Sequence, residues 1–61
     1  MNNQAMLIEM QSNRGFRQFG PSKVQRMFGL PYGKAVEWIE WLVGFGFAER
    51  IDDRPWEVRL I

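Results

Sequence analysis

The absence of both cysteine and histidine is what most limits the folds open to this 61-residue chain. A domain of this size buries only about 60% of the surface that its unfolded chain exposes, and many small domains add disulfides or structural zinc to compensate. Without those side chains, the chain can build neither a disulfide framework nor the usual zinc site, and aromatic residues must supply much of its core. Hydrophobic residues form 46% of the sequence and aromatic residues 15%, which favours a globular chain over a disordered one. We expect a single domain over residues 1–61.

The same absence excludes several kinds of active site. The chain has no thiol nucleophile, no usual zinc ligands and no side chain that titrates near neutral pH unassisted. Of the acidic pairs, Asp52 and Asp53 are typical of a turn, and Glu37 and Glu40, without a third ligand, are typical of a solvated helix face. We therefore predict a protein that is not an enzyme, with no catalytic residues, metal site, cofactor or small-molecule substrate.

The N-terminal sequence Met-Asn-Asn-Gln lacks the basic and then apolar pattern of a signal peptide. No apolar stretch approaches the roughly 20 residues that a membrane span needs. We expect a cytoplasmic protein that does not enter membranes, and the initial Met1 favours a complete small gene product.

Helical spacing of apolar residues predicts two short helices in the first half of the chain. The first covers residues 3–11, where Met6 and Met10 lie one turn apart and an asparagine at the start can cap the helix. The second begins with Ser22 as its N-cap and runs through Phe28, before a break at Gly29-Leu30-Pro31. Its inward side is expected to consist of Val24, Met27 and Phe28.

The strongest amphipathic pattern predicts a third helix, from residue 31 or 32 to Val43. Gly44 and Gly46 follow, which suits a helix end that turns into an extended segment. The apolar stripe of this helix, which we expect to face the core, consists of Ala35, Trp38, Ile39, Leu42 and Val43.

Two strands are expected at the end of the chain, over residues 47–51 and 56–60, around the turn at residues 52–55. A strand stub with Phe16 and Phe19 is expected before the second helix. The order of helix, strand stub, helix, turn, helix and hairpin predicts an α+β fold, a winged helix-turn-helix of three helices and a small β-hairpin wing. On the second strand, the alternating inward positions are Trp56, Val58 and Leu60.

Charge is distributed unevenly along the sequence, although the net charge is only +1. Residues 1–34 carry five basic side chains and one acidic side chain, a net charge of +4, whereas residues 35–61 carry three basic and six acidic side chains, a net charge of −3. An anionic partner would therefore prefer the first half of the chain.

The segment 22–35 reads Ser-Lys-Val-Gln-Arg-Met-Phe-Gly-Leu-Pro-Tyr-Gly-Lys-Ala. It resembles the C-terminal gamma domain of the FtsK and SpoIIIE DNA translocases, which commonly reads Val-Gln-Arg-x-Phe-x-Ile-Gly-Tyr-Asn-Arg-Ala. The match covers about two-thirds of the chain by pattern, and its most specific part is Val24-Gln25-Arg26 with Phe28 and Tyr32. The resemblance implies a winged-helix fold, a duplex-DNA ligand and a recognition helix that begins near Tyr32.

The chain departs from the family pattern on the face that would read DNA. Lys34 stands where the family usually has arginine, which keeps the charge but loses the fork that suits guanine. Gly33 stands where the family often has asparagine, and Glu37 where it has another arginine. The chain has no Walker motif, so the resemblance does not extend to a translocase motor.

The leading hypothesis is a small DNA-binding protein, a transcriptional or phage-type regulator that binds duplex DNA through the second and third helices. Its basic residues would neutralise phosphates, although an ordinary solvated surface is the alternative. The ring of Tyr32 could instead pack beneath the turn between the helices, and Asp52 and Asp53 oppose a DNA contact by the neighbouring Arg54. The predicted DNA-binding residues are Lys34, Arg26, Lys23, Arg17, Gln25, Tyr32 and Arg54.

The alternative function is a protein-binding module that reuses the same fold. Trp41 is expected on the outward face of the third helix with Glu37 and Glu40, and an exposed tryptophan is typical of a binding hot spot. This face could contact a protein partner or a second copy of the chain, as in a small phage-encoded inhibitor of a host nucleoprotein complex such as a CRISPR complex. Burial of Trp41 by the first helix or the wing is the structural alternative.

Overall fold

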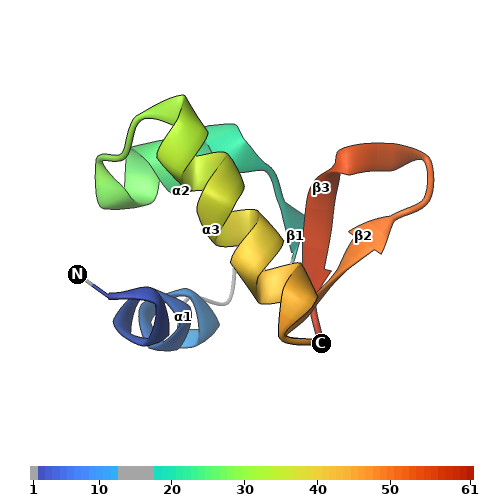
Figure 1. Cartoon of the computed structure of the whole chain (residues 1–61), viewed down its shortest axis with the longest axis horizontal. Coiled ribbons are helices and arrows are strands. Elements are labelled where there is room, and N and C mark those ends of the chain that lie inside the picture. The colour runs from blue at the N-terminus through green and yellow to red at the C-terminus, as the bar shows by residue number, and fades with distance from the viewer. Residues whose placement is uncertain (1, 13–17) are drawn as a thin grey trace.

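The computed structural model of the chain describes residues 2–12 and 18–61. Within them the polypeptide forms a small α+β domain of three helices and a three-stranded antiparallel sheet, an architecture compatible with a winged helix (Figure 1). The sheet lies to one side of the helices, and α3 runs from α2 toward the sheet (Figure 1). The elements are α1 (Asn3–Ser12), β1 (Gln18–Phe19), α2 (Pro21–Phe28), α3 (Tyr32–Gly44), β2 (Ala48–Ile51) and β3 (Arg54–Leu60).

The helices begin with different devices. At α1, the side-chain Oδ1 of Asn2 accepts a hydrogen bond of 2.7 Å from the backbone N–H of Ala5, as an N-cap does. The prediction that Ser22 caps α2 is wrong. This helix starts one residue earlier, with Gly20 at the N-cap position and Pro21 in the first turn, and no side chain caps it. The proline ring fixes φ near its helical value, so Pro21 sets the start of the helix by itself.

The turn between α2 and α3 depends on a glycine in the left-handed region. Gly29 follows α2 with φ of 65° and ψ of 37°, and its N–H donates to the carbonyl oxygen of Gln25 at 2.8 Å. Pro31, with ψ of 156°, then leads in extended conformation into α3. One of the two described glycines with positive φ therefore lies between the two helices that carry the candidate site.

Substitution of Gly29 by alanine is expected to lower the free energy of unfolding by about 1–2 kcal/mol, because a Cβ is disfavoured at positive φ even where space is open. Gly33, in the first turn of α3, is the matched control. A Cβ there also meets open space but lies at a helical residue. Gly33→Ala should therefore raise the free energy of unfolding, by up to about 1 kcal/mol. Urea titration measures both changes, and equal shifts would contradict the turn assignment.

The sheet has the order β1-β3-β2, so the last strand in sequence lies in the middle. β1 pairs with β3 through Gln18 and Phe19, opposite Arg59 and Val58. β2 pairs with β3 from Ala48 opposite Leu60, with an irregularity between Arg50 and Ile51. The strands differ from the predicted ranges: β2 begins one residue later, and β3 begins at Arg54, which leaves a turn of two residues. Phe16, predicted in the strand stub, lies outside the described residues.

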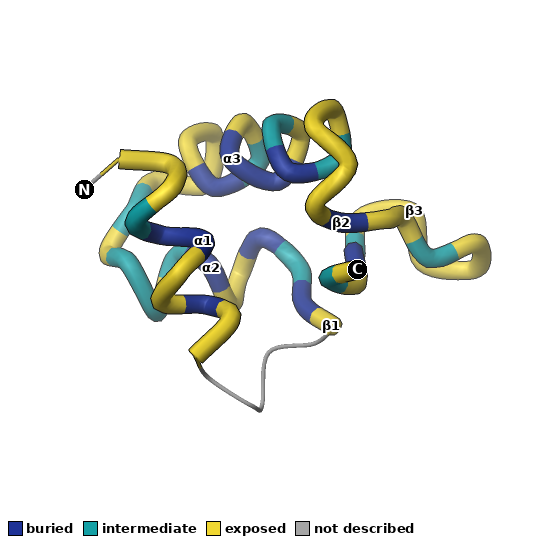
Figure 2. The backbone as a smooth tube through the Cα atoms, turned by 90° about the horizontal axis from the view of Figure 1, so that it is seen from below, coloured by how far each residue is buried: buried dark blue, intermediate teal, exposed yellow. Residues whose placement is uncertain are grey.

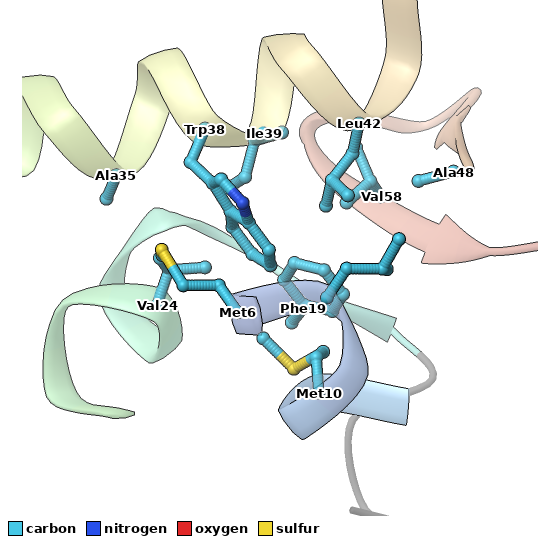
Figure 3. Packing of buried hydrophobic residues seen from close by; sticks show 11 residues of the cluster. Met6, Met10, Phe19, Val24, Ala35, Trp38, Ile39, Leu42, Ala48 and Val58 are labelled. Carbon is cyan, nitrogen blue, oxygen red and sulfur yellow. The ribbon is translucent and has the colours of Figure 1, made fainter. Parts of the chain in front are cut away.

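The core lies where α1, α2, α3 and the sheet meet (Figures 2 and 3). The predicted stripe of α3 is buried except for Val43, which is half-buried at the edge. The ring of Trp38 stacks on Phe19 of β1, with centroids 6.3 Å apart, and meets Phe28 of α2 edge-on at 5.6 Å. The buried apolar residues are Met6, Leu7, Met10, Phe19, Val24, Ala35, Trp38, Ile39, Leu42, Ala48 and Val58.

Candidate nucleic-acid interface

The segment from α2 to the first turn of α3 is the most positive surface that the structure describes. Between residues 21 and 34 the sequence has three basic residues, Lys23, Arg26 and Lys34, and no acidic residue. All three are exposed, whereas Val24 on the opposite side of α2 is buried. The buried side anchors the segment to the core and thereby directs its cations to solvent.

The N-terminal turn of α3 is open to solvent. Tyr32, Gly33 and Lys34 are all exposed. Tyr32 does not pack beneath the turn, since it is 58% exposed. A Cβ on Gly33 would meet no atom within 4 Å. The partial positive charge of the helix N-terminus therefore adds to that of the Lys34 side chain.

Gln25 and Arg17 complete the DNA contacts predicted for the first half of the chain. Gln25 is half-buried on α2, and its backbone carbonyl oxygen accepts from Gly29 in the turn. Arg17 lies outside the described residues. The exposed cations of α2 and α3 therefore define the candidate interface, with Gln25 at its inner border.

The outermost ridge of α3 is acidic. Opposite the buried stripe lie Gly33, Glu37, Glu40 and Gly44, all of them exposed. The Nζ atom of Lys34 is 3.5 Å from Oε2 of Glu37, and each side chain is 68% exposed. A pair this exposed contributes at most about 1 kcal/mol, so a phosphate can compete with Glu37 for Lys34. The carboxylates oppose any polyanion that lies along the whole helix.

The basic residues of the β2–β3 hairpin, which we call the wing, have partners within the same hairpin. Arg54 lies 3.6 Å from Glu57, measured from Nη1 to Oε2. Nη1 of Arg50 donates to the carbonyl oxygen of Pro55 at 3.0 Å, and Arg59 forms an ion pair with Glu49. The predicted contact Arg54 is exposed, but it lies beside Asp53 in the turn and shares its charge with Glu57.

Trp41 does not stand out into solvent as predicted. It is half-buried, because its ring packs against Phe45 and Phe47, with centroids 5.4 Å away in each case. The residues that carry the exposed apolar surface at this end of α3 are instead Phe45, 67% exposed, and Phe47, 39% exposed. Sequence reasoning missed both, although the flanking glycines indicate a tight turn that brings them back onto the helix.

Trp56 is a second correction, because it was predicted at an inward position but is 58% exposed. It lies on the part of β3 that precedes Val58, which β1 does not reach, and the β2–β3 hairpin there extends past the helices (Figure 2). Its ring borders a pocket between α3 and the wing. The lining residues are Pro21, Tyr32, Val36, Ile39, Glu40, Arg50 and Trp56.

Residues 2–12 and 18–61 offer neither a metal site nor a membrane span. No group of three or more acidic side chains in this part of the chain could hold a metal ion. None of its helices is both long and apolar enough to cross a bilayer.

Comparison of the chain with protein-family models, curated proteins and solved structures gave no match.

Proposed function

We propose that the chain is a winged-helix protein that binds duplex DNA, as a transcriptional or phage-type regulator, through α2 and the first turn of α3. The observation that carries this proposal is the exposed, exclusively basic charge of residues 21–34. A second helix that follows a tight turn is the usual reading element of a helix-turn-helix, and cations beside it neutralise phosphates. The similarity of Val24-Gln25-Arg26 and Tyr32 to the translocase gamma domain supports the same ligand.

The distribution of charge favours insertion of α3 by its N-terminal end. Tyr32, Gly33 and Lys34 enter the major groove first, with Lys23 and Arg26 on the flanking phosphates. Glu37 and Glu40 then stay at the groove margin, where repulsion from phosphates is smallest. Lysine presents a point charge in place of a bidentate fork, so most of the affinity comes from backbone contacts with modest sequence preference. Arg54 on the wing is an auxiliary contact.

Alanine substitution of Lys34 or Arg26 is expected to weaken DNA binding and to reduce the slope of log affinity against log salt by about 1 for each cation removed. Fluorescence-anisotropy titration against random and A·T-rich duplexes at several salt concentrations measures both quantities. Arg59→Ala is the matched control, since it removes the same charge from an exposed side chain on β3. If both test variants bind as the parent protein does, α2 and α3 are not the interface.

A protein-binding module remains the second candidate, and a specific observation favours it. The outer ridge of α3 bears carboxylates and leads to an exposed aromatic surface at Phe45 and Phe47, beside Trp41. This combination suits a basic protein partner, for example the DNA-binding groove of a nucleoprotein complex that the domain would block. Here Phe45→Ser should abolish capture of the partner, whereas in the DNA model it should leave duplex affinity unchanged.

A further inference from the structure

The pocket between α3 and the wing has two exposed aromatic rings at its border. Tyr32 is the first residue of α3 and Trp56 lies on β3, and each is 58% exposed. Large aromatic residues are usually buried, because their transfer out of water stabilises the fold. Here two elements far apart in sequence leave an aromatic side chain in solvent at the same pocket.

The interior of the pocket matches one small flat ring in size. Pro21, Val36 and Ile39 supply its apolar lining, and its volume is about 120 Å³. An apolar cavity of about 150 Å³ holds benzene. Because the pocket is open on one side, a single six-membered ring can enter it, and such a ring suits its short apolar lining better than a two-ring purine.

The charged residues that line the pocket, Glu40 and Arg50, offer both a hydrogen-bond acceptor and hydrogen-bond donors. The carboxylate of Glu40 accepts hydrogen bonds, and the guanidinium of Arg50 donates them. The hydrogen bond from Nη1 of Arg50 to Pro55 holds this side chain in place and leaves its other N–H groups for a ligand. The edge of cytosine carries both an amino donor, which carboxylates accept, and carbonyl and ring-nitrogen acceptors.

We infer that this pocket takes a single unpaired pyrimidine base, cytosine above all, from DNA held on the neighbouring α2–α3 surface. The inference rests on the proposed function. Continuity of the two sites supports a nucleic-acid base over a protein side chain, because Tyr32 borders the pocket and lies two residues from Lys34. Aromatic rings bind bases by stacking, which requires the base to leave the duplex stack.

The test compares three duplexes of the same flanking sequence: fully paired, with one bulged cytosine, and with one bulged abasic residue. The abasic bulge keeps the extra sugar-phosphate unit but lacks the base. We expect the cytosine bulge to bind about tenfold more tightly than the abasic bulge. Trp56→Ala should remove this difference and leave the affinity for the paired duplex unchanged. Phe45→Ala, which removes an exposed aromatic ring elsewhere, should preserve the difference.

Equal affinity for the two bulged duplexes would overturn the inference, as would a Trp56→Ala variant that retains the cytosine preference. Failure to bind any of the three duplexes would instead overturn the proposed function. The melting temperature of Trp56→Ala should lie within a few degrees of that of the parent protein, since the side chain is 58% exposed. A preference for the cytosine bulge that disappears with Trp56 supports the inference.

Discussion

Replacement of Trp38 by alanine is expected to remove much of the free energy of unfolding of the domain. Trp38 is 3% exposed and joins three elements: its ring meets Phe19 and Phe28, and its Nε1–H donates to the carbonyl oxygen of Asn3 at 3.4 Å. Loss of a buried tryptophan costs about 3–5 kcal/mol. A domain of 61 residues has a total stability of about 3–9 kcal/mol, so this single substitution removes much or all of it.

Thermal unfolding followed by far-ultraviolet circular dichroism measures this loss. Trp56→Ala is the matched control, because it removes the same side chain from a position that is 58% exposed. We expect the control to melt within a few degrees of the parent protein, and Trp38→Ala to melt far below it or to show no cooperative transition. A cooperative transition for Trp38→Ala near that of the control would contradict the central role of Trp38 in the core.

Charge reversal at Glu37 is expected to raise the affinity for duplex DNA about tenfold at low salt. The substitution Glu37→Lys adds a cation to the outer ridge of α3 and also removes the carboxylate that pairs with Lys34 at 3.5 Å. Lys34 and the new lysine at position 37 then both face the phosphates, in place of one ion pair. Anisotropy titration should show the gain at low salt and its decline as salt is raised.

Glu9→Lys is the matched control for Glu37→Lys, because it makes the same charge change at an exposed residue of α1. A gain confined to Glu37→Lys places the DNA next to α3, whereas equal gains in both variants indicate only attraction by net charge. The protein-binding model predicts a different result. Glu37→Lys should then weaken capture of a basic partner and leave DNA affinity flat.

The helical core could be predicted from the sequence because its signal is local. Ala35, Trp38, Ile39 and Leu42 recur at helical spacing, and all four are buried. The start of α2 could not be placed as well, since Ser22 and Pro21 both favour a helix start and only the backbone geometry shows that the helix begins at the proline, with no side-chain cap.

The errors at Trp41 and Trp56 have a different cause. On a regular helix Trp41 lies near the outward side, and only the return of the chain after Gly46, with φ of 78°, brings Phe47 against it. Alternation along β3 places Trp56 on the same face as Val58, but it does not tell how far the helices cover that face. The burial of both side chains depends on contacts between separate elements, and the periodicity of one element does not predict such contacts.

The position of β3 between β1 and β2 has a consequence for recognition. β1 immediately precedes α2 and β2 follows α3. Because β3 pairs with both strands, it fixes the two ends of the polypeptide that contains α2 and α3. The two helices are therefore held in their relative positions before any ligand arrives, and complex formation loses little backbone entropy. Substitutions that loosen the β1–β3 ladder should consequently reduce affinity by increasing the disorder of the free protein, with every ligand-binding side chain intact.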